Sequence, residues 1–336
     1  MPTTRYTDAG VSPRTNVYAE RQMLKHAMPV RILDKFGMMR PMPKNKTQVI
    51  KFRRPRIFTA ATTPLVEGVT PTATQFSYED VEATIKQYGQ VVEITDVIED
   101  THEDPVLNDA TIQAGENIGR TLEALDWGIL RAGTNVFFTN GSVRSSVNTP
   151  MTLSKQRAVI RALKAQKAYK ITRILSASVN YGTKAVEAAY VAVHHTDVEQ
   201  DIRTMAGFLP TSEYGQRTPI NEYELGSVED VRYICSPDLS SFLDAGGAFN
   251  GSGTEMVSNL GTSADVYPML FIGRDAYGIV PLRGQGAISP TILRPGVRDK
   301  SDPLGQRGYV GWKTWHTAVI LNQVWMARVE AAVTAL

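Results

Sequence analysis

Two stretches near the N-terminus carry the apolar pattern of β-strands. Residues 47–58 (TQVIKFRRPRIF) and 83–95 (ATIKQYGQVVEIT) are rich in β-branched and aromatic side chains, and both predict strands. The long stretch between them has no periodic pattern and contains Pro64, Gly68 and Pro71. Loops of this length are usually functional or disordered, so the sequence predicts an extended two-stranded hairpin. Because a lone hairpin is marginally stable in water, we expect it to dock on a neighbour.

A long helix is the clearest element that follows. Apolar residues recur on one helical face over residues 104–131, where Asp104 can cap the first turn and Pro105 suits the first helical position. At roughly 1.5 Å per residue the helix would form a rod of about 40 Å. The apolar stripe consists of Leu107, Ala114, Ile118, Leu122, Leu125 and Ile129. The glycines that indicate close approach of another backbone are Gly115, Gly119 and Gly128.

The rest of the chain predicts strands, turns and short helices. An amphipathic helix is expected over 152–169 and a short one near 184–188. The predicted strands lie at 171–176, 190–193, 231–235, 269–272 and 277–280, with one or two more in 310–332. The Gly- and Ser-rich residues 245–263 predict a mobile loop.

Composition places the chain among ordinary globular proteins. It has 336 residues, of which 42% are hydrophobic and 21% charged. The first ten residues lack the apolar core of a signal peptide, and no stretch approaches the roughly 18 apolar residues of a membrane span, so we expect assembly in the cytoplasm of the cell that makes it. Cys235 is the only cysteine, which excludes an internal disulfide and a Cys-rich zinc site.

Charge is distributed unevenly although the net charge is only +2. Residues 1–60 carry 13 Lys and Arg against three acids, whereas residues 61–130 carry 14 acids against two basic residues. The simpler interpretation is two solvated faces of one domain. The alternative is self-association in which the basic segment of one copy meets the acidic segment of the next. The candidate contact residues are Arg53, Arg54, Arg56, Glu67, Glu99, Asp100, Glu103 and Asp104.

No motif indicates catalysis. His194 and His195 precede several acids, but adjacent side chains on a strand point to opposite faces, so a cap formed by Thr196 or Asp197 is the preferred interpretation over a metal site. The nucleophile-elbow pattern near 261–265 lacks its final glycine. Residues 284–286 (GQG) lack the third glycine of a dinucleotide site, and no phosphate loop is present. We therefore predict no enzyme, no catalytic residue, no cofactor and no bound metal.

Two basic clusters are candidates for contact with nucleic acid. One contains Lys51, Arg53, Arg54 and Arg56. The other is the stripe Lys155, Arg157, Arg161, Lys164 and Lys167. Pairing between copies of the chain and plain solvation remain the alternatives for both clusters.

Several segments together resemble a known family. In order along the chain they are PLVEGVTPTA (64–73), EDPVLNDA (103–110), YVAVHHTDVEQDIR (190–203) and LGSVEDVRYICSP (225–237). They are similar to the coat proteins of tailed phages related to coliphage N-four. The resemblance covers most of the chain, and the Glu-Gly-Val-x-Pro and Gly-x-Val-x-x-Val-Arg elements are moderately specific in combination.

That resemblance implies an α+β fold of the Hong Kong 97 type. Its parts would be an N-terminal arm at 1–46, an extended β-hairpin loop at 47–100, a peripheral domain at 101–190 with the spine helix at 104–131, an axial domain at 191–285, and C-terminal strands at 286–336 that return to the peripheral and axial sheets.

The resemblance also implies a function. The chain would be a major capsid protein that self-assembles into the pentamers and hexamers of an icosahedral virion shell and encloses double-stranded DNA without sequence-specific binding. Scaffold, decoration and portal proteins would be further partners, and no membrane would be involved. The alternatives are an encapsulin-type nanocompartment shell and a metal-dependent enzyme centred on His194 and His195.

Overall fold

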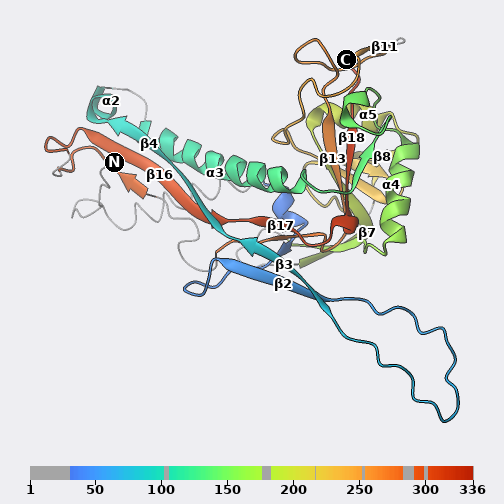
Figure 1. The fold of residues 1–336 in the computed structure, drawn as a ribbon. Coiled ribbons are helices and arrows are strands. Elements are labelled where there is room, and N and C mark those ends of the chain that lie inside the picture. The colour runs from blue at the N-terminus through green and yellow to red at the C-terminus, as the bar shows by residue number, and fades with distance from the viewer. Residues whose placement is uncertain are drawn as a thin grey trace.

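A computed structural model describes residues 31–101, 106–175, 183–215, 217–251, 254–282, 291–298 and 302–335. The chain forms three parts: a unit built on a large sheet, an arm that carries the long helix α3, and a hairpin that projects away from both (Figure 1). No helix in the described ranges is long and apolar enough to cross a membrane. Residues 1–30 of the predicted N-terminal arm lie outside these ranges.

The largest sheet has eight strands. Their order is β5 (Val136–Phe138), β18 (Met326–Ala331), β13 (Tyr267–Ile272), β7 (Thr183–His194), β10 (Val231–Cys235), β9 (Glu224–Val228) and β8 (Phe208–Pro210), with β6 (Ile171–Leu175) paired along β7. Strand β13 is buried throughout because both faces of the sheet are covered. The sheet therefore divides two hydrophobic cores.

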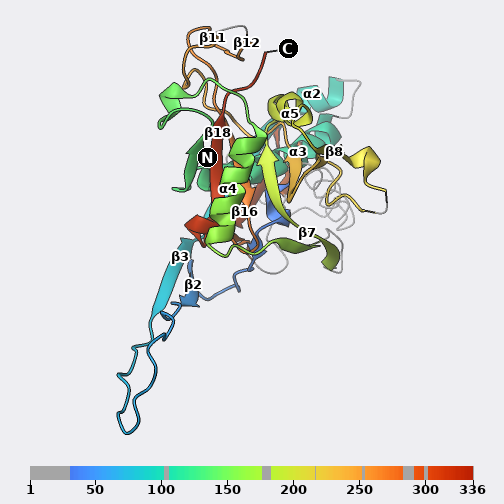
Figure 2. The same ribbon diagram turned by 90° about the vertical axis from the view of Figure 1, so that its right-hand side faces the viewer.

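The first core lies under α4 (Leu153–Ala165) and α5 (Glu199–Arg203). Val159, Ile160 and Leu163 of α4 pack on alternate residues of the strands, as the sequence predicts. Figure 2 shows α4 in front of the sheet and the projecting hairpin below it. Thr152 caps α4 by accepting the backbone N–H of Lys155.

The opposite face of the sheet packs against the C-terminal end of α3 (Val106–Leu130) and the short 3-10 helix η2 (Leu33–Lys35). Trp127 and Leu130 are fully buried there. Predicted contacts Leu125 and Ile129 are only half-buried, because the buried face of α3 turns toward the large sheet near its end. Gly128 is exposed and nothing lies near its Cβ position, so the close backbone approach expected there is wrong.

The N-terminal part of α3 lies along a second sheet, which pairs β15 (Thr291–Leu293), β16 (Arg307–His316) and β4 (Lys86–Thr95). The core between them consists of Ile94, Ala114, Ile118, Leu122, Val310 and Trp312. This apolar seam gives the arm its rigidity over most of the length of α3. The short helix α2 (Asp96–Thr101) follows β4 at the far end (Figure 1).

Smaller sheets complete the fold. β1 (Met38–Met39), β14 (Tyr277–Ile279) and β17 (Ala318–Ile320) join the N-terminal segment to the body. β11 (Asn250–Gly251) and β12 (Thr254–Glu255) form a short hairpin inside the segment predicted to be a mobile loop. β2 (Val49–Pro55) pairs with β3 (Tyr78–Thr84) in the projecting hairpin.

Several predicted elements differ from the structure. Residues 83–95 do not form one strand, because the chain passes from β3 to β4 at the buried Ile85 and the two strands join different sheets. The helix expected near 184–188 is part of β7, where pairing with β6 overrides local propensity. The terminal run 310–332 supplies three strands, β16, β17 and β18, to three sheets. Strand β7 spans the predicted domain boundary at 190/191, and the domain limits stay a prediction.

Candidate assembly surfaces

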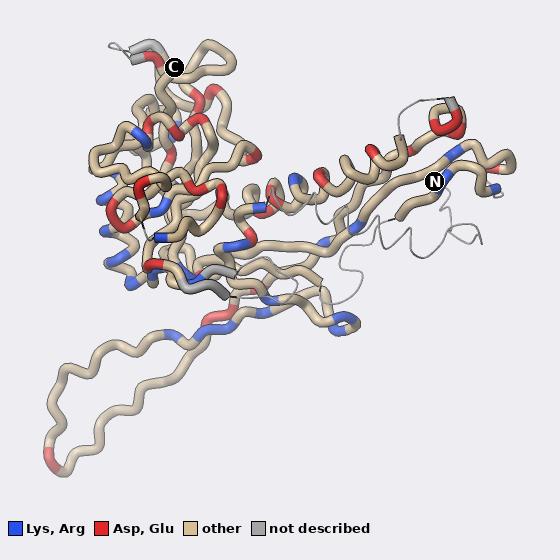
Figure 3. The backbone as a smooth tube through the Cα atoms, turned by 180° about the vertical axis from the view of Figure 1, so that it is seen from behind, with Lys and Arg blue, Asp and Glu red and all other residues tan. Residues whose placement is uncertain are grey.

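The projecting hairpin, hereafter the finger, consists of β2, the finger loop (residues 56–77) and β3. The two strands pair residue by residue from Val49 opposite Thr84 to Pro55 opposite Tyr78. Ion pairs cross the ladder between Lys51 and Glu82 at 2.7 Å, Arg53 and Asp80 at 2.7 Å, and Arg54 and Glu79 at 2.9 Å. Figure 3 shows both signs of charge on the stem and almost none beyond it.

These pairs change the role that the sequence assigns to the basic cluster. Arg53 and Arg54 are engaged within their own finger, and hydrogen bonding to Arg53 lowers the pKa of Asp80. Arg56 makes no ion pair with the described residues, and its backbone N–H donates to the Ser77 carbonyl at 3.0 Å. Part of the opposite charge in neighbouring segments of the sequence is thus neutralised inside one subunit.

The root of the finger is anchored on the subunit that carries it. Ile50 and Phe52 of β2 and Ala83 of β3 pack against Met42 and Val280 of the body. Ala83 and Val280 are buried, whereas the outward residues of β2 are exposed. The stem therefore has a fixed direction, which positions the finger loop away from the rest of the molecule (Figures 1 and 2).

The finger loop exposes apolar side chains to an unusual extent. Glu67 is the only charged residue between Arg56 and Glu79. The exposed apolar residues of the loop are Ile57, Phe58, Leu65, Val66, Val69 and Phe76. Phe76 packs edge-on against Tyr78, with ring centroids 4.7 Å apart. The ring centroids of Phe76 and Phe58 are 5.9 Å apart. Several large apolar side chains exposed on one loop indicate an interaction site.

The described acidic contact candidates lie in two separate parts of the subunit. Glu67 lies in the finger loop, beside a turn in which the Val69 N–H donates to the Val66 carbonyl and Gly68 has a φ of +77°. Glu99 and Asp100 are exposed on α2, at the far end of the arm from the finger (Figures 1 and 3). Glu103 and Asp104 lie outside the described residues.

The end of the arm carries a second exposed apolar group. Val91 of β4, Val97 and Ile98 of α2 and Leu304 before β16 are all largely exposed. Strand β4 has one partner, β16, along all ten of its residues, and its other edge pairs with no described strand. An unpaired edge of this length is a ready template for pairing with another chain.

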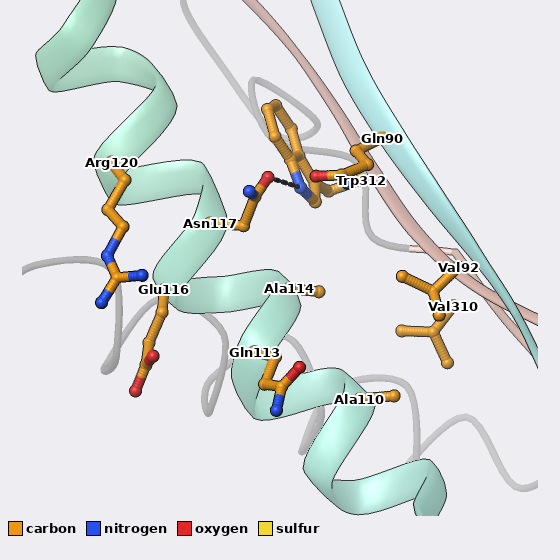
Figure 4. A pocket seen from close by; sticks show the side chains of 10 residues that line it. All are labelled: Gln90, Val92, Ala110, Gln113, Ala114, Glu116, Asn117, Arg120, Val310 and Trp312. Atoms are coloured by element: carbon orange, nitrogen blue, oxygen red, sulfur yellow. Dashed lines mark hydrogen bonds between the residues drawn. The ribbon is translucent and has the colours of Figure 1, made fainter.

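A groove of about 440 Å³ separates α3 from the β4–β16 ribbon (Figure 4). Its floor is apolar, with Val92, Val310 and Trp312 facing Ala110 and Ala114. Its rim is polar, and Trp312 Nε1 donates to Asn117 Oδ1 at 3.2 Å.

The basic stripe of α4 is partly neutralised within the subunit. Arg157 pairs with Glu229 at 2.5 Å, and Lys164 pairs with Asp230 at 2.5 Å. Hydrogen bonds from Lys164 and Lys170 lower the pKa of Asp230. The stripe is therefore a less basic surface than its sequence suggests.

The paired histidines serve local structure. His194 is buried, its Nδ1 lies 2.8 Å from the His195 carbonyl oxygen, and burial lowers the pKa of His194 to about 4. The His195 ring accepts the Asp197 N–H at 3.2 Å and caps the 3-10 helix η4 (Thr196–Val198), so the predicted cap at Thr196 or Asp197 is wrong. Within the described ranges no group of three or more His, Cys, Asp or Glu side chains could hold a metal ion.

The segment 261–265 likewise has a structural explanation. Asp265 is fully buried and accepts the backbone N–H groups of Asp244 at 2.7 Å and Asn259 at 3.1 Å. The carboxylate braces two loops and faces no nucleophile. Residues 284–286 lie outside the described residues.

Sequence reasoning missed the apolar residues of the finger loop as contact candidates, since it selected charged residues. The signal was present: residues 57–78 contain one charge and several large apolar side chains. Their exposure, which distinguishes a contact surface from a core strand, required the structure.

Comparisons with known proteins agree on one class. Residues 78–330 match the family model described as phage capsid protein. Among solved structures, the capsid of Ralstonia phage GP4 is similar with a TM-score of 0.64 and 14% identity, covering 89% of this chain and 88% of that one. The cyanophage Pam1 capsid has a TM-score of 0.59, 13% identity and coverage of 99% and 97%. The head of Helicobacter pylori bacteriophage KHP40 has a TM-score of 0.56, 12% identity and coverage of 99% and 94%. No curated protein sequence matches the chain.

Proposed function

The chain belongs to the phage capsid protein family, and on that premise we propose that it is the major capsid protein of a tailed double-stranded DNA phage. It is a structural protein of the virion shell rather than an enzyme. Its α+β fold is that of Hong Kong 97-type capsid proteins, as the resemblance predicts. Capsid formation requires that the chain associate with copies of itself.

The parts of the fold suggest their places in a shell. We assign α3 and the β15–β16–β4 sheet to the peripheral domain, the finger to the extended loop and the unit around the eight-stranded sheet to the axial domain. On this assignment the axial domain begins near β5, well before residue 191, because β5, β6 and β7 share its sheet. β16 and β18 are the C-terminal strands that return to the two units.

One observation carries the proposal: the finger loop is apolar, nearly uncharged and uncovered by its own subunit. In a monomer, the exposed apolar side chains of this loop gain no stabilisation from burial. A second copy that covers the loop would supply that burial. The surfaces at the other end of the molecule, including the open edge of β4, offer a receiving surface.

The finer assignments rest on the same proposal. Pentamers and hexamers, an icosahedral arrangement around double-stranded DNA, and partners such as scaffold, decoration and portal proteins are expected of a major capsid protein. The segments at 64–73 and 225–237 support a relation to the coat proteins of phages related to coliphage N-four. Arg56, Glu67, Glu99 and Asp100 remain candidate contacts between copies.

The test is assembly of the full chain. Sedimentation velocity over a range of concentrations and negative-stain microscopy should reveal rings or closed shells. A chain that remains a monomer at the highest attainable concentration, in the presence of double-stranded DNA and under crowding, would contradict the proposal. The nanocompartment alternative predicts shells that co-purify with a cargo enzyme instead of filling with DNA.

A further inference from the structure

A buried group of acids lies where the N-terminal segment crosses the last turns of α3. Glu123 is fully buried, and its carboxylate accepts the backbone N–H of Ile32 at 3.2 Å and that of Leu33 at 3.1 Å. No other side chain holds these two amide groups among the described contacts. The segment Arg31–Phe36, hereafter the latch, is thus fixed to the helix through one carboxyl group.

Two further acids surround this carboxyl group. Asp126, one turn along α3, is fully buried and lies 2.6 Å from His316 Nε2 of β16. Arg31 lies 3.8 Å from both Asp126 and Asp34. Among the described residues, Asp34 Oδ1, Asp126 Oδ2 and Arg31 Nε have no hydrogen-bond partner. Lys35 of the latch donates to Asn221 Oδ1 at 3.2 Å, and its positive charge opposes the rise in the pKa of Asp34 that burial causes. Tyr277 of β14 donates its hydroxyl to the Leu33 carbonyl.

The cluster therefore holds three carboxyl groups, with Arg31, Lys35 and His316 around them. Glu123 itself makes no ion pair with the described residues, and the contacts of its carboxyl group are the two latch N–H groups. Burying uncompensated negative charge is costly, and a carboxyl group in this position gains by keeping its proton. Burial raises the pKa of Glu123 to about 8, with Asp126 and Asp34 adding to the shift and the Leu33 N–H and Arg31 opposing it. Burial also raises the pKa of Asp34.

We propose that the latch is proton-linked: it lies closed on α3 while the buried cluster retains a proton, and it detaches from α3 when that proton is lost. The apolar contacts of Ile32, Leu33 and Phe36 with Trp127 and Leu130 hold the closed form. Loss of the Glu123 proton leaves a buried negative charge beside Asp34 and Asp126, and the two latch N–H groups compensate it only in part. Opening of the latch admits water, which solvates that charge. In a shell subunit this would change how the N-terminal arm is tethered to the spine helix.

The direction of the pH dependence follows from the two states. In the open form Glu123 faces water with its ordinary pKa near 4.5, whereas in the closed form its pKa is about 8. The closed form binds the proton more tightly, so closure is fully favoured below pH 4.5 and loses its advantage as pH rises toward 8. Between these limits the ratio of open to closed forms rises by up to about tenfold per pH unit, the limit for one linked proton.

Hydrogen exchange of the full chain tests this linkage. The intrinsic exchange rate of an amide rises about tenfold per pH unit, so an amide with pH-independent opening shows a slope near 1 in log rate against pH. For peptides covering residues 31–36 we expect a slope approaching 2 between pH 6 and 7.5. Peptides from β13, which is buried and contains no titratable cluster of this kind, should retain a slope near 1 in the same samples.

Glu123→Gln is the matched variant, since its carboxamide keeps the shape and one acceptor for the latch but cannot ionise. In this variant the log exchange rate of the latch peptides should rise with pH with a slope near 1. A slope near 1 in the native chain would overturn the proposal, and that measurement does not require the variant to fold. A slope near 2 that persists in Glu123→Gln would also overturn it, because another group would then carry the linkage. Both outcomes are independent of whether the chain forms shells.

Discussion

Replacing three apolar residues of the finger loop isolates the contribution of the finger to assembly. Leu65, Val66 and Val69 are 78%, 68% and 62% exposed, and no described side chain of the subunit packs on them. Leu65→Ser, Val66→Ser and Val69→Ser together should leave the stem pairs, the root packing and both main cores intact. The variant removes apolar area only where a second copy would cover it.

The expected loss follows from the exposed fractions. Complete burial of an aliphatic side chain stabilises by about 1.5–3 kcal/mol, so the portion still available at these three positions is worth roughly 1–2 kcal/mol each. Full coverage by a neighbour would then contribute about 3–6 kcal/mol per finger. At about 1.4 kcal/mol per tenfold change, docking should weaken by roughly 100-fold to 10,000-fold. Half coverage would still weaken it by more than about tenfold.

The assay is the subunit concentration at which rings or shells appear in light scattering, with sedimentation velocity to identify the species. The triple-serine variant should need a much higher concentration than the native chain. A matched control, Thr62→Ser, Thr63→Ser and Thr74→Ser, changes three exposed positions of the same loop without removing much apolar surface and should assemble normally.

Assembly of the triple-serine variant within threefold of the native concentration would refute the docking role of the finger loop. Equal impairment of the threonine control would instead assign the effect to the loop backbone. Circular dichroism and thermal unfolding of both variants should match the native chain, because the substituted residues contribute little to the fold of the monomer.

Further predictions concern the subunit itself. Trp127→Ala removes a fully buried side chain whose Nε1 donates to the Ser240 carbonyl at 3.0 Å, and should lower the free energy of unfolding by about 3–5 kcal/mol in chemical denaturation. Arg53→Glu should loosen the finger stem by setting like charges opposite each other, and Arg53→Glu with Asp80→Arg should restore it; hydrogen exchange of β2 and β3 reports both, and equal exchange in the two variants would contradict the pairing. Gly246→Ala should lower the midpoint of thermal unfolding, because its Cβ would lie 2.4 Å from the Val147 carbonyl oxygen and 2.7 Å from that of Ala264. Gly207→Ala is the comparison for backbone strain without steric overlap, because Gly207 has open space around it and a φ of +81°.

Because Arg53 pairs with Asp80 and Arg54 with Glu79, replacing Arg53, Arg54 and Arg56 together by acidic residues is a poor test of contact between copies. Such a variant would set two acids on β2, at positions 53 and 54, against Asp80 and Glu79 on β3, and would disrupt the stem before any contact with a second copy is tested. Arg56→Glu alone avoids this problem, because Arg56 makes no ion pair with the described residues.

Local pattern was enough to predict much of the fold. The long helix is confirmed over Val106–Leu130, and β10 matches its predicted span. The periodicity of apolar residues and the capping residues depend only on neighbours within a few positions, so the sequence alone determines them. The same holds for the strand β2 and for the lack of regular structure in the finger loop.

Only the tertiary structure decided which strands pair, which charges meet and which apolar residues stay uncovered. Nothing local separates β3 from β4 or makes residues 184–188 part of a strand. The pairing partners β2, β16 and β6 decide this. The sequence makes Arg53 a candidate for contact with another copy. In the structure it forms an ion pair with Asp80 of its own subunit, because the hairpin brings the two side chains together. The cluster of Glu123, Asp126 and His316 was invisible in the sequence, because its members become neighbours only when helix, strand and N-terminal segment pack around one buried site.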